Sequence, residues 1–222
     1  MAQERSGDGS HPRFSDVRWF AQVDSTNRLA AELVRGGAGD GLVVGADHQT
    51  GGRGRRGRTW ESRPGSSLMV SVVLRPVPDL VTLAAGLAAA EACEAVAGVP
   101  VHLKWPNDVM GAGGKLGGIL SELVGDAAVV GLGLNLAWAP PGAVKLGADV
   151  DRQVLLHAWL SRLDAPADVL VRYRARCATL GRRVRVELPG ETLEGVADAV
   201  DEEGRLVVGG RHVTAGDVVH LR

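Results

Sequence analysis

The sequence has few of the residues that build disulfide scaffolds or metal sites. It contains only two cysteines, Cys93 and Cys177, which lie far apart. Its six histidines form no HxH or HExxH pattern. A disulfide scaffold is therefore excluded, and we expect no metal ligands in the functional site. Two unpaired cysteines suit a reducing compartment, so we expect a cytoplasmic protein.

The sequence also lacks a long apolar run and an excess of one charge. Its most apolar stretch, residues 80–101, carries Glu91 and Glu94, so it predicts a buried helix and not a membrane span. Residues 1–15 are polar and do not have the apolar centre of a signal peptide. The net charge of −1 does not favour a polyanionic partner. We therefore expect neither a membrane nor a nucleic-acid partner.

The 222 residues, 45% of them hydrophobic, suffice for one large domain or for one large and one small domain. Residues 1–14 are polar and rich in Gly and Ser, and we expect a disordered tail there. Hydrophobic periodicity and turn residues predict strands over 17–23, 42–47, 67–74, 101–105, 116–123 and 127–134. They also predict helices over 24–35, 79–96, 152–163 and 167–180, with Asp79 capping the second. This order alone leaves α+β and α/β folds open.

The pattern changes after Gly181, where apolar and polar residues alternate with period two. Short strands are predicted over 183–188, 193–200, 205–208, 211–214 and 218–221. The turns between them contain Pro189-Gly190, Glu203-Gly204 and Gly209-Gly210. Five short strands in so few residues indicate a small barrel, so we place a domain boundary near Gly181.

The most unusual segment is Gly52-Arg53-Gly54-Arg55-Arg56-Gly57-Arg58, which places four arginines among six residues. Arginine presents a planar, charged fork that matches phosphate and carboxylate oxygens. Glycine lets the backbone approach a ligand closely. A free loop of this composition resists ordering, because like charges repel and glycine is costly to fix. We therefore expect a loop that orders over a phosphorylated ligand.

Three other interpretations of this loop stay open at this point. Gly52, Gly54 and Gly57 formally match the dinucleotide-binding pattern G-x-G-x-x-G. That motif needs a helix directly after it, and Pro64-Gly65 interrupts the following segment. An RGG-like nucleic-acid segment is a second interpretation, weakened by the balanced charge of the chain. The third is a solvated loop without function.

Five segments, in this order and spacing, resemble biotin protein ligases over roughly residues 20–136. The segments are Asp24-Ser25-Thr26-Asn27, Gln49-Thr50-Gly51-Gly52-Arg53-Gly54-Arg55-Arg56-Gly57-Arg58-Thr59-Trp60, Lys104-Trp105-Pro106-Asn107-Asp108, Lys115 to Glu122, and Gly131 to Asn135. Each segment alone is weak evidence. Five in order make coincidence improbable.

The resemblance implies an α+β fold. Residues 15–180 would form a catalytic domain like the class II aminoacyl-tRNA synthetases, and residues 181–222 an SH3-like barrel. The implied activity is an ATP-dependent ligase that makes biotinyl-5′-AMP from biotin and ATP. It then transfers biotin to a lysine of a biotin carboxyl carrier domain. Mg²⁺ is expected with ATP, no permanently bound cofactor is expected, and the protein would be a monomer or a homodimer.

The resemblance also implies a role for each site residue. Lys115 and Arg53 would be catalytic, with Arg53 bridging the biotin carboxylate and the phosphate. The expected biotin-binding residues are Ser25, Thr26, Asn27, Gln49, Arg53, Gly54, Arg55, Lys115 and Gly118. The expected ATP or adenylate residues are Arg55, Arg58, Trp60, Lys104 and Asn135. Arg55 would also retain the adenylate. Asp108 is a candidate for metal or lysine positioning, or simply for a turn.

Two features depart from the family pattern. Many bacterial relatives carry an N-terminal helix-turn-helix domain, and the residues before the first predicted strand are too few for one, so we expect no repressor role. Residues 137–151 match the pattern poorly. Two alternative functions remain: a lipoate ligase or octanoyl transferase of the same superfamily, and a non-catalytic nucleic-acid module. A lipoate enzyme typically has an Arg-Ser-Gly-Gly-Gly stretch in place of the arginine-rich loop.

Overall fold

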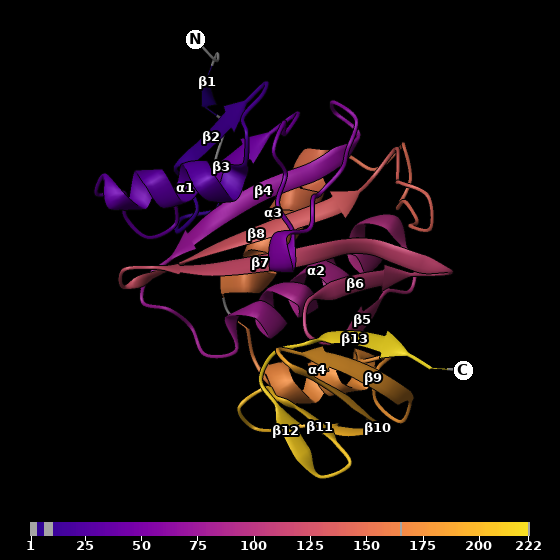
Figure 1. Ribbon diagram of the computed structural model, residues 1–222. Helices are drawn as coiled ribbons and strands as arrows, with labels where there is room; N and C mark the ends of the chain where they lie inside the picture. The colour runs from indigo at the N-terminus through magenta and orange to yellow at the C-terminus, as the bar shows by residue number, and fades with distance from the viewer. Residues whose placement is uncertain (1–3, 7–10, 165, 222) are drawn as a thin grey trace.

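A large mixed sheet forms the centre of the computed structural model, which describes residues 4–6, 11–164 and 166–221. Within these residues the sheet has eight strands in the order β1-β2-β3-β4-β8-β7-β6-β5 (Figure 1). The strands are β1 (Glu4–Ser6), β2 (Val17–Phe20), β3 (Val43–Ala46), β4 (Ser67–Leu74), β5 (His102–Lys104), β6 (Asp108–Gly111), β7 (Gly114–Val124) and β8 (Ala127–Asn135). All neighbouring strands are antiparallel except β2 and β3, which are parallel.

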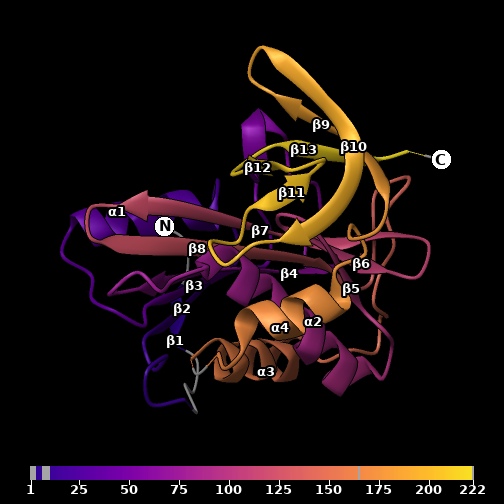
Figure 2. The ribbon, with the colours of Figure 1, turned by 90° about the horizontal axis from the view of Figure 1, so that it is seen from below.

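Helices cover both faces of this sheet (Figure 2). The helix α1 (Thr26–Arg35) packs on one face against β4, while α2 (Val81–Ala97) and α3 (Arg152–Asp164) pack on the other. The short helix α4 (Val169–Arg176) lies against α2. Every residue of β4 is buried, because one face of the strand meets α1 and the other meets α2 and α3. Its run of Leu, Met and Val fits burial on both faces.

The C-terminal strands form a second, antiparallel sheet in the order β12-β11-β10-β9-β13. They are β9 (Arg183–Leu188), β10 (Glu191–Val200), β11 (Leu206–Val208), β12 (Arg211–Val213) and β13 (Asp217–His220). Along β9, Val184 and Val186 are buried, whereas Arg183 and Arg185 are exposed. Side chains on a strand point alternately to its two faces, so the period-two pattern of the sequence places its valines in the core.

Hydrogen bonds join this small sheet to the end of the large one. The Trp105 indole N–H donates to the Gly204 carbonyl at 2.9 Å. The Trp105 backbone N–H donates to Thr179 Oγ1 at 3.1 Å, and His220 Nε2 lies 3.2 Å from the same oxygen. Thr179 is fully buried. One hydroxyl therefore connects the end of β5, the start of the small sheet and its last strand.

The predicted α+β architecture with a separate C-terminal β-unit is confirmed. The predicted strand over 67–74 matches β4, and the strands predicted over 116–123 and 127–134 fall within β7 and β8. The predicted tail over 1–14 is wrong for part of its length, since residues 4–6 pair with β2 and Phe14 is fully buried. The remaining tail residues, 1–3 and 7–10, lie outside the described part of the chain.

Two element boundaries and one whole strand also differ from the prediction. The helix α2 begins at Val81 with Leu80 at its N-cap, so Asp79 does not cap it. The helix α4 ends at Arg176, because Cys177 leaves the helical conformation and its neighbour Ala178 bonds back to Leu103. The strand β6 was not predicted. The chain turns at Pro106 and pairs back along β5, so the proline ends one strand and also begins a hairpin.

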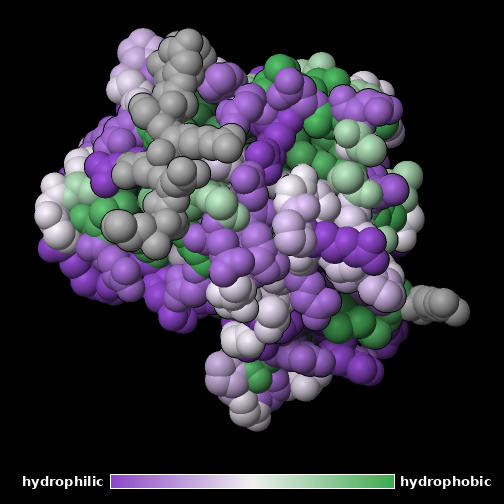
Figure 3. Space-filling model, turned by 90° about the horizontal axis from the view of Figure 1, so that it is seen from above, coloured by the Kyte–Doolittle hydropathy of each residue, from purple (hydrophilic) through white to green (hydrophobic). Residues whose placement is uncertain are grey.

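No helix within the described ranges has the length and hydropathy needed to cross a lipid bilayer. The face seen from above carries many polar residues, with hydrophobic residues in separate patches among them (Figure 3).

Replacing Thr179 by valine should weaken the junction between the two sheets. The valine keeps the shape but leaves the buried Trp105 backbone N–H without its acceptor. We expect the free energy of unfolding to fall by about 1–3 kcal/mol, measured by urea denaturation. Thr214→Val, at an exposed position, is the matched control. Equal effects of the two variants would contradict this role of Thr179.

Candidate active site

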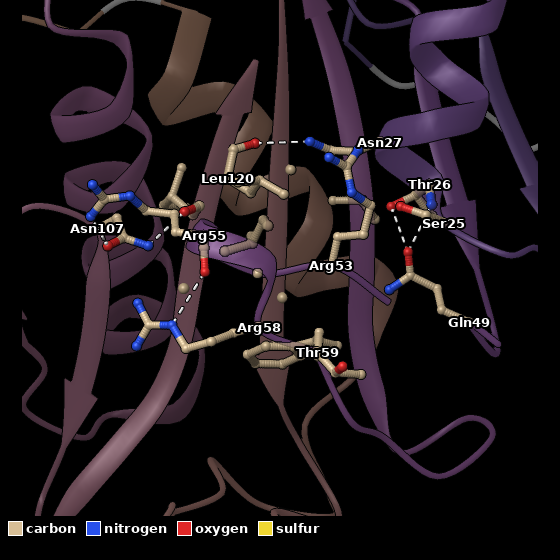
Figure 4. Close-up of a pocket in the computed structure, with 18 of the residues that line it drawn as sticks. Ser25, Thr26, Asn27, Gln49, Arg53, Arg55, Arg58, Thr59, Asn107 and Leu120 are labelled. Atoms are coloured by element: carbon tan, nitrogen blue, oxygen red, sulfur yellow. Dashed lines mark hydrogen bonds between the residues drawn. The ribbon is translucent and has the colours of Figure 1, made fainter. Parts of the chain in front are cut away.

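A pocket opens where β7 and β8 meet the start of α1 and the arginine-rich loop over 52–58 (Figure 4). Its polar wall comes from α1 and the residue Gln49, its cationic wall from the loop and Lys115, and its floor from β8. The lining residues are Ser25, Thr26, Asn27, Gln49, Arg53, Gly54, Arg55, Arg58, Thr59, Trp60, Val70, Asn107, Lys115, Gly118, Ile119, Leu120, Gly131, Leu132 and Gly133.

The polar wall begins at the first turn of α1. Ser25 is the N-cap residue, as expected, but its side chain makes no capping hydrogen bond. Gln49 Oε1 replaces it and accepts from the Thr26 backbone N–H at 2.7 Å and from the Thr26 hydroxyl at 3.1 Å. Among the described residues, the Gln49 amide nitrogen donates only to the sulfur of Met69, at 3.4 Å. Gln49 therefore positions the helix start and keeps a donor available for a ligand.

Asn27 is buried, with only 4% of its surface exposed. Hydrogen bonds to three neighbouring residues hold its side chain. Ser71 donates to its Oδ1 at 2.6 Å, and its Nδ2 donates to the Leu120 carbonyl at 3.0 Å and to Glu122 Oε2 at 2.9 Å. These bonds tie α1 to β4 and β7. Buried polar side chains with full sets of partners are rigid, so the orientation of Asn27 is set before a ligand binds.

The arginine-rich loop folds into a tight hairpin around a single 3₁₀ turn, Arg55–Gly57. The Gly54 N–H donates to the Arg58 carbonyl at 2.7 Å. Arg56 has φ of 55°, in the left-handed region that is costly for any residue with a Cβ. The expected ordering of this loop over a phosphorylated ligand stays a prediction.

The four arginines of the loop face acceptors from three different parts of the chain. Arg53 Nη2 lies 2.9 Å from Glu122 Oε1, on β7. Arg55 Nη1 donates to Asn107 Oδ1 at 3.1 Å, ahead of β6. Arg58 Nη2 lies 2.8 Å from Asp217 Oδ1, on β13, and Arg56 Nη1 lies 3.5 Å from the other oxygen of that carboxylate. Burial and the charges of Arg58 and Arg56 lower the pKa of Arg55.

Lys115 enters the pocket from the start of β7. Its Nζ lies 2.6 Å from Asp108 Oδ1, on the neighbouring strand β6. A Cβ at position 118 would sit 3.3 Å from this ammonium nitrogen, so Gly118 leaves room for the lysine to cross the strand. Asp108 thus positions Lys115, which was one of the two roles considered for it.

Backbone groups of two glycines on β8 form part of the pocket floor. A Cβ on Gly133 would lie 2.7 Å from Trp60 Cε2, and a Cβ on Gly131 would lie 2.1 Å from Asn27 Oδ1. Both distances are too short for real contacts, so only glycine lets the indole of Trp60 and the amide of Asn27 lie on β8. The Trp60 indole nitrogen is buried without a hydrogen-bond partner among the described residues.

A second hollow adjoins this pocket on the far side of Trp60. Thr59, Trp60 and Lys115 line both spaces, and the second is completed by Glu61, Asn135, Pro140, Pro141 and Ala143. Asn135 is 2% exposed; its Nδ2 donates to the Val144 carbonyl at 3.1 Å. Its Oδ1 is buried without a partner in the part of the chain that the structure describes.

The structure brings together almost all residues predicted for the site, and Lys104 is the exception. Lys104 lines a separate hollow beside Pro106 and Asp217, between the β5–β6 turn and β13; Arg58 borders this hollow and the main pocket. Three acceptors were not predicted as site residues. Asn107 and Glu122 lie inside two of the quoted segments, so their presence in those segments was the available signal. For Asp217 the sequence offered none.

The described residues contain no group of three His, Cys, Asp or Glu side chains arranged to hold a metal ion. The carboxylates near the pocket, on Asp108, Glu122 and Asp217, are each engaged by a lysine or an arginine.

Comparison with known proteins identifies this arrangement. Residues 19–135 match the biotin/lipoate A/B protein ligase family, and residues 179–221 match the biotin protein ligase C-terminal domain. The chain belongs to the biotin protein ligase family. The resemblance predicted from the five segments is thus confirmed, as is the class of enzyme, a biotin ligase. The C-terminal match favours this class over the lipoate alternative.

Similar proteins cover most of the chain. The biotin–[acetyl-CoA-carboxylase] ligase of Mycobacterium tuberculosis is 42% identical over 97% of this chain and 92% of its own length. The enzyme of the same name from Paracoccus denitrificans is 34% identical over 86% and 93%. The solved structure of the Aquifex aeolicus biotin protein ligase in complex with biotin and ATP has a TM-score of 0.81. It is 27% identical and covers 94% of this chain and 100% of that one.

Replacing Gly133 by alanine should lift Trp60 from β8, because the added methyl group overlaps its indole ring. We expect faster amide hydrogen exchange over residues 52–60, measured by mass spectrometry, with little change elsewhere. Gly39→Ala is the matched control, since nothing lies within 4 Å of a Cβ at that exposed position. Unchanged exchange in the loop of the Gly133 variant would show that Trp60 does not depend on this glycine.

Proposed function

We propose that the protein activates biotin with ATP to give biotinyl-5′-AMP and then transfers the biotinyl group to a lysine of a biotin carboxyl carrier domain. The observation that carries this proposal is the convergence of Arg53, Arg55, Arg58 and Lys115 on one pocket whose opposite wall is neutral and polar. A ligand with a polar uncharged end and an anionic end fits this division.

The neutral wall suits the ureido ring of biotin. Ser25, Thr26 and Asn27 present short polar side chains, and Gln49 has a donor without a strong partner. Gly54 and Gly118 leave space beside the cationic wall. We assign these residues to biotin binding, together with Arg53, Arg55 and Lys115, because a bound biotin would point its carboxylate away from α1.

The cationic wall suits the chemistry of adenylation. An oxygen of the biotin carboxylate attacks the α-phosphorus of ATP, and the bond to pyrophosphate breaks. The carrier lysine amine then attacks the acyl carbon, and AMP leaves with the bonding electrons. Lys115 and Arg53 would hold the two anions together and balance the charge that develops on the phosphate. Fixed positive charge lowers such a barrier without reorganising during the reaction.

The second hollow suits the nucleotide. We assign Trp60 to stacking on adenine and Asn135 to the nucleotide, because the buried Oδ1 of Asn135 has no partner among the described residues. Arg55 and Arg58 are assigned to the phosphates. Lys104 lines a different hollow, so its role toward ATP stays a prediction. Mg²⁺ would enter as part of the ATP substrate, since the described side chains offer no metal cluster.

Other features of this proposal rest on the sequence. The division into a catalytic domain over 15–180 and a barrel over 181–222 is supported by the two separate sheets. A cytoplasmic location is supported by Cys93 and Cys177, which are both free and buried. The absence of a permanently bound cofactor and of nucleic-acid and membrane partners stays a prediction. So does the choice between a monomer and a homodimer.

The direct test is transfer of biotin to a purified biotin carboxyl carrier domain in the presence of Mg²⁺ and ATP. We expect one biotin per carrier, detected as a mass increase, and none when ATP is omitted. Lipoate offered with a lipoyl domain serves as the matched alternative. Transfer of lipoate but not of biotin would overturn the substrate assignment, and retention on heparin without biotin-dependent ATP–pyrophosphate exchange would favour the nucleic-acid module.

Lys115→Gln should abolish most adenylate formation, because it removes the ammonium group facing the proposed carboxylate. The loss of one preorganised charged donor typically costs about 10²–10³ in rate. The rate of adenylate formation is measured by biotin-dependent ATP–pyrophosphate exchange. Lys145→Gln, at an exposed lysine outside both pockets, is the control and should exchange at the normal rate. A Lys115 variant with near-normal exchange would reject the catalytic role.

Arg55→Gly should let the adenylate escape before transfer. The variant loses the guanidinium that crosses the pocket to Asn107, and with it one contact closing the loop. We expect increased labelling of bystander lysines on an added unrelated protein, measured with streptavidin blots. Arg63→Gly changes an exposed arginine outside the pocket and serves as control. Equal bystander labelling by the Arg55 variant and the native protein would contradict retention by Arg55.

A further inference from the structure

Glu122 lies at the crossing of two hydrogen-bond systems, and neither the sequence motifs nor the comparisons give it a role. Its Oε1 faces Arg53 Nη2 at 2.9 Å, and its Oε2 accepts from Arg53 Nη1 at 3.3 Å. The same Oε2 accepts from Asn27 Nδ2 at 2.9 Å. The carboxylate therefore joins the cationic wall of the pocket to its neutral wall, and in Figure 4 Arg53 extends toward Asn27.

This arrangement places Arg53 in competition between two anions. Both terminal nitrogens of its guanidinium already face Glu122, in the paired geometry that arginine and carboxylate prefer. A ligand anion that binds Arg53 must share or displace that carboxylate. The side chains are 44% and 30% exposed, so the ion pair is partly solvated and can exchange at modest cost.

We infer that Glu122 is a positioning residue that pairs with Arg53 as a stand-in anion until the carboxylate of the ligand binds. Glu122 thereby sets how strongly the pocket prefers a charged ligand over a neutral one. The inference rests on the proposed function, since it takes the ligand to be biotin. Without Glu122, Arg53 would hold the carboxylate of unreacted biotin more tightly. Tighter binding of the unreacted state does not by itself speed the reaction.

A purely structural role of Glu122 makes a different prediction. If the carboxylate only supports Asn27, its loss would weaken charged and neutral ligands to the same extent. Glutamine distinguishes the two roles, because its side-chain oxygen can still accept from Asn27 Nδ2 while the negative charge facing Arg53 is gone.

The test is isothermal titration of the full chain, without ATP, with biotin and with biotinamide, its neutral analogue. In Glu122→Gln we expect the affinity for biotin to rise by up to about fivefold, the upper end of the range for a partly exposed ion pair. The affinity for biotinamide should stay within about twofold of the native value. Asp126→Asn, at an exposed carboxylate on the β7–β8 turn, is the matched control and should leave both affinities unchanged.

A second variant keeps the test decisive if the glutamine variant folds poorly. Glu122→Ala removes an acceptor of Asn27, so both ligands should bind more weakly, yet the ratio of biotin to biotinamide affinity should still rise. In an Arg53→Gln background, Glu122→Gln should no longer raise that ratio, because the guanidinium that pairs with the Glu122 carboxylate is absent.

The outcomes separate this inference from the proposed function. An unchanged ratio in both Glu122 variants, or a rise that persists without Arg53, overturns the stand-in role while leaving biotin as the ligand. A native chain that binds neither biotin nor biotinamide overturns the proposed function itself.

Discussion

Positive charge concentrated in one pocket is the constraint on which this structure depends. Four cationic side chains converge there, and each is matched to an oxygen acceptor of the protein: Arg53 to Glu122, Arg55 to Asn107, Arg58 to Asp217 and Lys115 to Asp108. Unpaired, these charges would repel one another and open the loop. The cationic side chains of the three ion pairs are 37–56% exposed, so each pair contributes modestly on its own, and the set of acceptors together defines where the cations lie.

The acceptors come from separate elements, so the arginine-rich loop contacts both sheets. Glu122 and Asp108 belong to the large sheet, whereas Asp217 is the first residue of β13 in the small sheet. The arginine-rich loop therefore spans both. The buried contacts of Trp105 with Gly204 and Thr179 fix the small sheet at the distance that this span requires.

Local sequence patterns predicted much of the fold. They predicted far fewer of the contacts between residues that are distant in the sequence. The β-branched run of β4, the turn at Gly125-Asp126 and the alternation of β9 depend on neighbouring residues, so the sequence shows them. Asp217, 159 residues from Arg58, does not fall in any such pattern. Asn107 lines both the main pocket and the hollow beside β13, whereas Lys104, in the same motif, lines that hollow and not the main pocket.

The glycines of β8 determine how this pocket can evolve. Its base is formed by peptide groups at positions 131 and 133, with Trp60 and Asn27 lying directly on them. No substitution can remove atoms from a glycine, so any change at these positions narrows the cavity and none enlarges it. Variants that accept bulkier ligands must therefore arise at the other lining positions, where side chains can still be shortened.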